Sequence, residues 1–210
     1  MRVVAGVARG MPLSAPRGDR TRPITDRVKE TLFAILGERV PGSRVLDLYA
    51  GSGAIGIEAL SRGAEHADFV ERDRAALAAI RANVERTGLA AGATVHGSDV
   101  ERFLARASGP WNIAILDPPY EVRAIVSPLR AVVPSLAPGA SVVIKHFWRV
   151  EAPEVEGLDV TRQRRFGETM LTFLEARDEW REWPSFPDRS TPSRTRTSTW
   201  SSVPRACSIG

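Results

Sequence analysis

The 210-residue sequence contains a single cysteine, Cys207, so it cannot form an internal disulfide. One isolated thiol fits a reducing compartment, where structural disulfides are rare. No run of apolar residues approaches the ~18–20 needed to cross a membrane, and the N-terminus lacks the continuous apolar segment of a secretory signal. We therefore expect a cytoplasmic protein that makes no contact with a membrane.

Histidine is also scarce. The three histidines are far apart along the chain and have no cysteine partners: His66, His96 and His146. Zinc sites are built from clustered His and Cys ligands, so the sequence predicts no metal site. A hydrophobic content of 43% over 210 residues is enough for one good-sized core, so we expect one main domain with shorter appendages.

Positive charge gathers at the start of the chain. The first thirty residues hold seven basic and three acidic side chains, a local excess of +4 that equals the net charge of the whole chain. Such a basic arm suggests a polyanionic partner. A solvated surface that keeps the protein soluble explains the same charge equally well, so composition alone leaves both interpretations open.

Residues 47–56 hold three glycines spaced G-x-G-x-x-G, between an apolar strand and the start of a helix. Glycine adopts the positive φ of a tight turn, and its missing Cβ lets the backbone approach a ligand near the free N–H groups of the helix. The spacing alone also fits a plain tight turn. Glu71, twenty residues after Gly51, is suitably placed for ribose hydroxyls. Asp47, at the end of the strand, is not needed by NAD but suits a positively charged cofactor, and Asp-x-x-x-Gly-x-Gly resembles the pattern of class I S-adenosylmethionine methyltransferases.

Strand and helix patterns alternate from residue 44 onward. The predicted strands are 44–49, 66–71, 93–97, 112–117 and 140–147, and the predicted helices are 55–62, 74–87, 100–107 and 122–136. This alternation predicts a parallel α/β sheet with right-handed crossovers. Two further apolar runs, 158–166 and 169–176, predict an antiparallel hairpin at the end of the sheet. The whole is typical of a Rossmann-like class I methyltransferase with seven strands.

We divide the chain into three parts. Residues 1–42 are expected to form a basic β-hairpin arm and a helix capped by Thr25 or Asp26, with RNA and cofactor contacts. Residues 43–176 are expected to form the cofactor-binding domain. Residues 177–210, rich in Ser, Thr, Arg and Pro without periodicity, are expected to be a largely disordered tail.

Asp117-Pro118-Pro119-Tyr120 directly follows the predicted strand 112–117. Two prolines fix the backbone and remove two N–H donors, which leaves carbonyls and the Asp117 carboxylate as acceptors for an exocyclic amino group. Tyr120 can stack on a planar base. A rigid turn is the alternative, but a cofactor loop nearby favours catalysis. The tetrapeptide resembles the motif of methyltransferases that act on adenine N6, guanine N2, cytosine N4 or glutamine amides.

The N-terminal third narrows this resemblance. Arg20 to Phe33, Asp47 to Gly63, Asp117 to Tyr120 and Phe166 to Thr169 together resemble the RsmD family, which methylates guanine N2, at guanine 966, in bacterial 16S rRNA. Ile24 and Phe166 are small departures from the family pattern. The resemblance implies a monomer that acts on 16S rRNA within a 30S subunit or an assembly intermediate.

The resemblance also implies site residues. The catalytic set is Asp117, Pro118, Pro119 and Tyr120. The set for S-adenosylmethionine is Thr25, Asp47, Tyr49, Gly51, Ser52, Gly53, Glu71, Arg72 and Asp99. The RNA-binding set is Arg9, Arg20, Arg22 and Arg27. By residue type alone Asp99 fits a helix N-cap as well as a ligand of the adenine amino group.

Three other functions stay open on the sequence. The first is a DNA adenine or protein glutamine methyltransferase, which the basic arm and the lack of a target-recognition domain disfavour. The second is an NAD-linked oxidoreductase, which would leave Asp117-Pro118-Pro119-Tyr120 without a role. The third is an RNA-binding module without catalysis, which the intact Asp47, Gly51, Gly53 and Asp117 disfavour.

Overall fold

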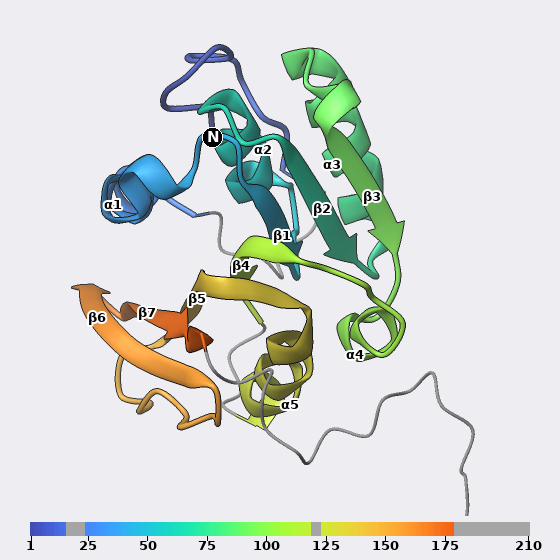
Figure 1. Ribbon diagram of the computed structural model, residues 1–210. Coiled ribbons are helices and arrows are strands. Elements are labelled where there is room, and N and C mark those ends of the chain that lie inside the picture. Colours follow the sequence, from blue (N-terminus) through green and yellow to red (C-terminus); the bar gives the residue numbers. More distant parts are fainter. Residues whose placement is uncertain (16–23, 119–122, 179–210) are drawn as a thin grey trace, which may run out of the picture.

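The computed structural model describes residues 1–15, 24–118 and 123–178, which fold into one twisted sheet with helices on both faces (Figure 1). The seven strands lie in the order β3-β2-β1-β4-β5-β7-β6. Their bounds are β1 (Arg44–Leu48), β2 (His66–Glu71), β3 (Ala93–Gly97), β4 (Trp111–Leu116), β5 (Leu136–Phe147), β6 (Leu158–Phe166) and β7 (Thr169–Ala176).

The first five strands are parallel, and β7 runs antiparallel between β5 and β6. The predicted α/β class, the mainly parallel seven-stranded sheet and the C-terminal antiparallel hairpin are thus confirmed. β5 begins four residues earlier than expected, at Leu136.

Two different sets of helices cover the sheet, one on each face. The arm, α1 (Asp26–Leu36), α2 (Ala54–Ser61) and α3 (Arg74–Thr87) pack on one face around Phe33, Ile57 and Ile80. On the other face, α4 (Val100–Leu104) and α5 (Arg123–Val132) pack around Leu104 and Leu129. Thr25 caps α1, as predicted, and its hydroxyl accepts a hydrogen bond from the N–H of Val28. Within the described ranges, no helix is long and apolar enough to span a membrane.

Two predicted helices are shorter than expected. The helix predicted over 100–107 is α4, which ends at Leu104 after five residues. The helix predicted over 122–136 is α5, which ends at Val132 and is followed by a 3-10 turn, η3 (Val133–Ser135). Pro134 lies in that turn, and a proline at this point cannot continue the α-helical hydrogen bonding. Short 3-10 turns η1 (Gly37–Arg39) and η2 (Ala90–Gly92) complete the elements.

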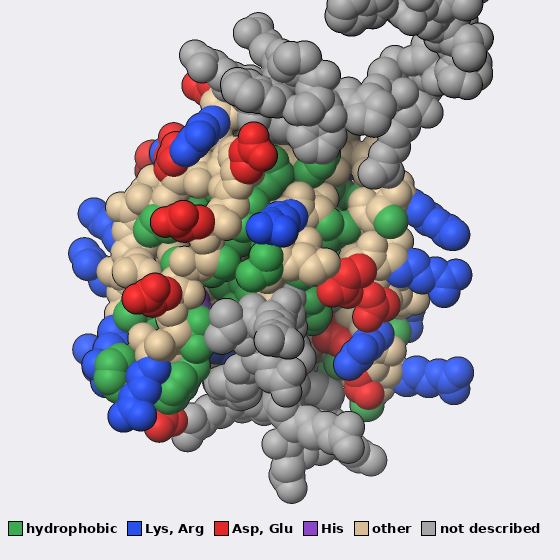
Figure 2. All heavy atoms as spheres, turned by 90° about the horizontal axis from the view of Figure 1, so that it is seen from below, with side chains coloured by type: hydrophobic (Ala, Val, Ile, Leu, Met, Phe, Trp, Pro, Cys, Tyr) green, Lys and Arg blue, Asp and Glu red, His purple; other side chains and the backbone are tan. Residues whose placement is uncertain are grey.

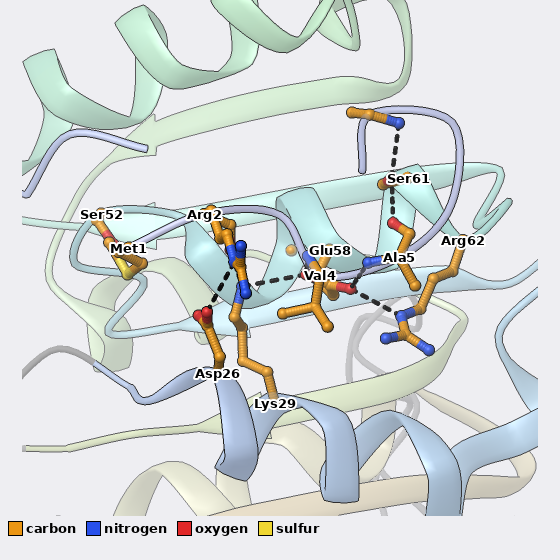
Figure 3. Close-up of polar contacts among 12 residues, drawn as sticks. Met1, Arg2, Val4, Ala5, Asp26, Lys29, Ser52, Glu58, Ser61 and Arg62 are labelled. Carbon is orange, nitrogen blue, oxygen red and sulfur yellow. Dashed lines mark hydrogen bonds and ion pairs between the residues drawn. The ribbon is translucent and has the colours of Figure 1, made fainter. Parts of the chain in front are cut away.

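The N-terminal arm is built into the domain. It forms a minimal hairpin with one bridge, Arg2–Pro12, and its backbone then bonds to α2. Glu58 of α2 is the centre of this contact: its two oxygens accept from the N–H groups of Val4 (2.8 Å) and Ala5 (2.9 Å), as Figure 3 shows. The arm is therefore fixed to the same face of the sheet as α1 and α2.

Buried charge holds this contact together. Lys29 of α1 donates to the Glu58 carboxylate at 3.1 Å, and both side chains are 0% exposed. Arg62 reaches the other Glu58 oxygen at 2.9 Å, and Arg2 pairs with Asp26 (Figure 3). Two of the seven basic side chains counted at the N-terminus are thus engaged in ion pairs within the fold.

The end of the described chain is also anchored. The N–H of Arg177 donates to the Gly157 carbonyl, and its guanidinium pairs with Asp159 at 2.7 Å. The rest of the predicted tail, from residue 179, lies outside the described residues.

Candidate functional site

The candidate site lies where β1, β2, β4 and β5 end. Asp47 pairs in register with Phe69 of β2 and Ile115 of β4, so Asp47, Glu71 and Asp117 come from the carboxyl ends of adjacent parallel strands. In open α/β sheets this edge is where ligands bind. The loops that follow each strand carry most of the predicted site residues.

Backbone conformation shapes the glycine loop between β1 and α2. Tyr49 has φ 60°, an uncommon value for a residue with a Cβ, and Gly51 and Gly53 have φ 56° and 75°. Gly56 has another reason to be glycine: a Cβ there would lie 2.3 Å from the Phe69 ring. The first two glycines therefore make the turn, and the third lets α2 pack closely on β2, which is the division of roles in the G-x-G-x-x-G motif.

Asp47 ties the loop to the sheet. Its Oδ2 accepts a hydrogen bond from the N–H of Gly56 at 3.0 Å, and the side chain is only 1% exposed. Burial raises the pKa of Asp47 to about 8; the Gly56 hydrogen bond opposes this rise, and the nearby Asp117 and Glu71 carboxylates add to it.

Glu71 is turned toward the same loop. Its Oε2 accepts from the N–H of Gly51 at 3.0 Å, and its Oε1 accepts from those of Arg72 (2.8 Å) and Asp73 (2.9 Å). Glu71 thus spans the loops that follow β1 and β2. Its predicted contact with ribose hydroxyls stays a prediction, since each oxygen retains acceptor capacity beyond these bonds.

Asp99 is the N-cap of α4, one of the two roles that the sequence left open. Its Oδ1 accepts from the N–H of Glu101 at 3.1 Å, and its Oδ2 lies 3.5 Å from the Arg72 guanidinium. A side-chain hydrogen bond with Glu101 is the main reason that the pKa of Asp99 is lowered. The carboxylate is 43% exposed, so its role toward a cofactor stays a prediction. Burial raises the pKa of the nearby Tyr49 to about 12, which keeps that hydroxyl protonated.

Asp117 is held by a residue that sequence reasoning missed. The Lys145 ammonium donates to both carboxylate oxygens of Asp117, at 2.8 and 2.6 Å, from the neighbouring strand β5. Burial raises the pKa of Asp117, and the Lys145 charge opposes that rise. The sign available in the sequence was a lysine directly after the apolar residues Val142–Ile144, near the end of a predicted strand.

Asn83 is a second missed residue. It is 0% exposed on α3, and its amide donates to the Ser14 carbonyl and to the Ser52 carbonyl, each at 2.9 Å. Its Oδ1 accepts from the N–H of Ser14 at 2.8 Å. One side chain therefore joins the arm, α3 and the glycine loop. The sequence could have indicated that Asn83 is buried, because it lies three residues after Ile80, on the same face of α3.

The remaining predicted residues are dispersed or lie outside the description. Pro118 is buried beside Asp117, while Pro119, Tyr120, Arg20 and Arg22 lie outside the described residues. Arg9 and Arg27 are exposed on the arm and on α1. Thr25 serves as the α1 cap, and the Ser52 hydroxyl lies 3.8 Å from the Met1 sulfur. Within the described ranges, no group of three acidic, His or Cys side chains could hold a metal ion.

The site fits a cofactor that carries positive charge and approaches the backbone. A Cβ at Gly51 would meet only the Tyr49 carbonyl, at 4.0 Å, so the loop is open at the point where a ligand needs the missing side chain. Asp47 Oδ1 has no hydrogen-bond partner among the described residues. A buried carboxylate oxygen of this kind is suited to a cationic group.

Comparison with known proteins agrees with this geometry. The family model described as "Conserved hypothetical protein 95" matches residues 1–175. YlbH of Bacillus subtilis (strain 168) is 39% identical over 183 residues, which covers 84% of this chain and all of that protein. Ribosomal RNA small subunit methyltransferase D of Escherichia coli (strain K12) is 42% identical over 120 residues, 57% of this chain and 60% of that protein. The solved structure of yhhF from Escherichia coli has a TM-score of 0.78 at 31% identity and covers 85% of this chain and 98% of that one.

Proposed function

The chain belongs to the RsmD family of S-adenosylmethionine-dependent methyltransferases, and from this premise we propose that it methylates the exocyclic N2 of a guanine in bacterial 16S rRNA. Guanine 966 is the position that the family resemblance indicates. The observation that carries the proposal is the Asp117 carboxylate, held by Lys145 at the end of β4 and followed by Pro118, beside the Asp47 loop. An acceptor in that place suits an amino group as the methyl acceptor.

Bound S-adenosylmethionine supplies a methyl group activated by its sulfonium. Asp47, Gly51, Glu71 and the N-terminus of α2 would hold that cofactor. Asp117 would accept a hydrogen bond from the guanine amino group, which directs the nitrogen lone pair toward the methyl. Transfer would leave S-adenosylhomocysteine as the second product, and the Asp117 carboxylate or water would take the proton that the nitrogen loses. Positioning supplies most of the rate in such a transfer.

Lys145 acts through Asp117 as a positioning residue. Two bonds of 2.8 and 2.6 Å restrict the carboxylate to one orientation, and the ammonium favours its charged form. Each carboxylate oxygen has a further lone pair for the substrate. The ion pair thus leaves Asp117 able to accept while fixing where it points.

The RNA substrate is supported by the family and by the exposed basic side chains. The Escherichia coli (strain K12) relative is named as a ribosomal RNA small subunit methyltransferase, and it is 42% identical over 120 residues. Arg9 and Arg27 are exposed near the arm and suit a polyanion. We extend the proposal to a cytoplasmic monomer that acts on a 30S subunit or its assembly intermediate.

The experiment is methyl transfer to 30S particles from a strain without the enzyme, with the product nucleoside identified by mass spectrometry. Asp117→Ala should slow transfer by two orders of magnitude or more, by analogy with the ~2.7–4 kcal/mol lost with one preorganised hydrogen bond. Asp117→Asn keeps one acceptor oxygen and should retain more activity than alanine. Both variants should bind S-adenosylhomocysteine like the wild type. A near-normal rate for Asp117→Ala would overturn the mechanism, and a product other than N2-methylguanosine would overturn the substrate.

A further inference from the structure

Two arginines lie close to the ring of Trp148, just after β5. The Arg165 Cζ is 3.6 Å from the centroid of the Trp148 ring, and the Arg149 Cζ is 5.0 Å from it. The N–H of Trp148 donates to the Glu168 carbonyl at 3.0 Å, which joins the end of β5 to the turn between β6 and β7. Stacking on an aromatic face holds a guanidinium in place. The ring therefore fixes two positive groups at one point of the surface.

The edge strand β6 extends this charge. Its residues from Asp159 to Arg165 are all exposed, and β6 pairs only with β7. Two of its three arginines donate to backbone carbonyls, Arg164 Nη1 to Gln163 at 3.2 Å and Arg165 Nε to Gly167 at 2.8 Å. We call the set the β6 arginine cluster: Arg162 and Arg164 on one face of the strand, and Arg165 on the other face, stacked on Trp148 beside Arg149.

Charged side chains on an edge strand also prevent strands of different molecules from pairing, which is the simpler explanation of exposed arginines. That role is served by any charged residue, and it does not require stacking on a tryptophan. It also does not require several arginines on one strand. The composition of the cluster is therefore better matched to an anionic ligand.

Sheet register connects the cluster to the catalytic carboxylate. Arg164 pairs with Leu171 of β7, and Leu171 pairs with Lys145 of β5. Lys145 holds Asp117, so Arg164 and Asp117 lie in one row across the sheet. Leu171, in the middle of this row, is 1% exposed, and Arg165 projects from the opposite face of β6. Three strand spacings separate them, a distance of ~14 Å. Figure 2 views the side to which β2 and β3 point, where Lys and Arg side chains stand out at both flanks, together with Asp and Glu side chains.

We propose that the β6 arginine cluster binds the phosphates of the single-stranded RNA that carries the target guanine. This inference rests on the proposed function and adds a second RNA contact, at the opposite end of the sheet from the arm. Guanidinium groups form paired hydrogen bonds with phosphate oxygens, and two of them are oriented by Trp148. β6 is three strands away from β4, so an RNA strand held at β6 has ~14 Å to cross to the strand end that carries Asp117.

The test compares Arg162→Gln/Arg164→Gln/Arg165→Gln with a matched control, Arg81→Gln/Arg106→Gln/Arg130→Gln. The control removes the same charge from exposed positions on α3, before β4 and on α5. Binding of unmodified 16S rRNA transcript is measured from 50 to 300 mM salt. Each lost phosphate contact lowers the slope of log K against log salt by ~0.7, so the triple variant should lose up to ~2 and bind up to about 100-fold more weakly near 0.1 M salt. The control should keep the wild-type slope.

Two further measurements separate the possible outcomes. S-adenosylhomocysteine affinity should be unchanged in both triple variants, and Trp148→Ala should weaken RNA binding more than Trp148→Phe, which keeps a ring. An unchanged slope for the β6 variant overturns the inference. Normal binding to transcript with lost methylation of 30S particles also overturns it and points to an acidic ribosomal protein as the ligand. If the wild type methylates no rRNA, the proposed function itself fails.

Discussion

Glu58 offers the sharpest test of how the arm is held. Glu58→Ala removes a fully buried carboxylate that accepts from two arm N–H groups, from Lys29 and from Arg62. Lys29 is 0% exposed, so its charge would lose a buried counterion. Breaking a buried pair by removing one partner costs about 3–5 kcal/mol, a large part of the ~5–15 kcal/mol by which domains are stable. At ~2–4 °C per kcal/mol for a chain of this size, we expect Tm to fall by ~6–20 °C.

The assay is urea and thermal unfolding followed by circular dichroism, with Glu85→Ala as the control. Glu85 is exposed on α3 and has no ion pair in the described residues, so its removal should change stability by less than ~0.5 kcal/mol. Adding Lys29→Met to Glu58→Ala should recover part of the loss, because no buried charge then lacks a partner. A loss below ~1 kcal/mol for Glu58→Ala, or no recovery in the double variant, would refute the reasoning.

Three more predictions concern the site. Because the pKa of Asp47 is raised to about 8, the folded chain keeps a proton that the unfolded chain loses near pH 4, and stability is lost as pH rises between these values. Asp47→Asn should therefore have the stability of the wild type at pH 4 and be more stable than it by up to ~5 kcal/mol at pH 9, which melting at each pH would measure. It should also bind S-adenosylhomocysteine more weakly than the wild type, which calorimetry would measure. Lys145→Met should raise the pKa of Asp117, so the acid limb of the pH–rate profile should move to higher pH, whereas Lys145→Arg should restore it; an unmoved limb would contradict the positioning role. Asn83→Ala should weaken cofactor binding through the Ser52 carbonyl and expose the arm to proteolysis, and equal protection of the arm in both proteins would count against this link.

Local sequence decided the elements and the glycine loop. Alternation of apolar strands with amphipathic helices is set by neighbours a few residues apart, so β2, β3 and α3 have the predicted bounds. The positive φ of Gly51 and Gly53 follows from the same short-range chemistry, because only glycine makes that turn at no steric cost. Asp47 and Asp117 could be named because each stands at the end of an apolar strand and inside a short motif, before Gly51 and before Pro118 respectively.

Tertiary structure decided what those residues touch. Lys145 is 28 residues from Asp117, and Glu58 is 54 residues from Val4, so only strand register and helix packing bring them together. Counting charge along the chain treated Lys29 as a free cation, although packing buries it against Glu58. The row from Asp117 to Arg164 likewise depends on β7 lying between β5 and β6, an order that no local pattern specifies. The two members of a buried charged pair can be far apart in sequence. The topology of the whole sheet therefore decides which side chains meet, and no local pattern does.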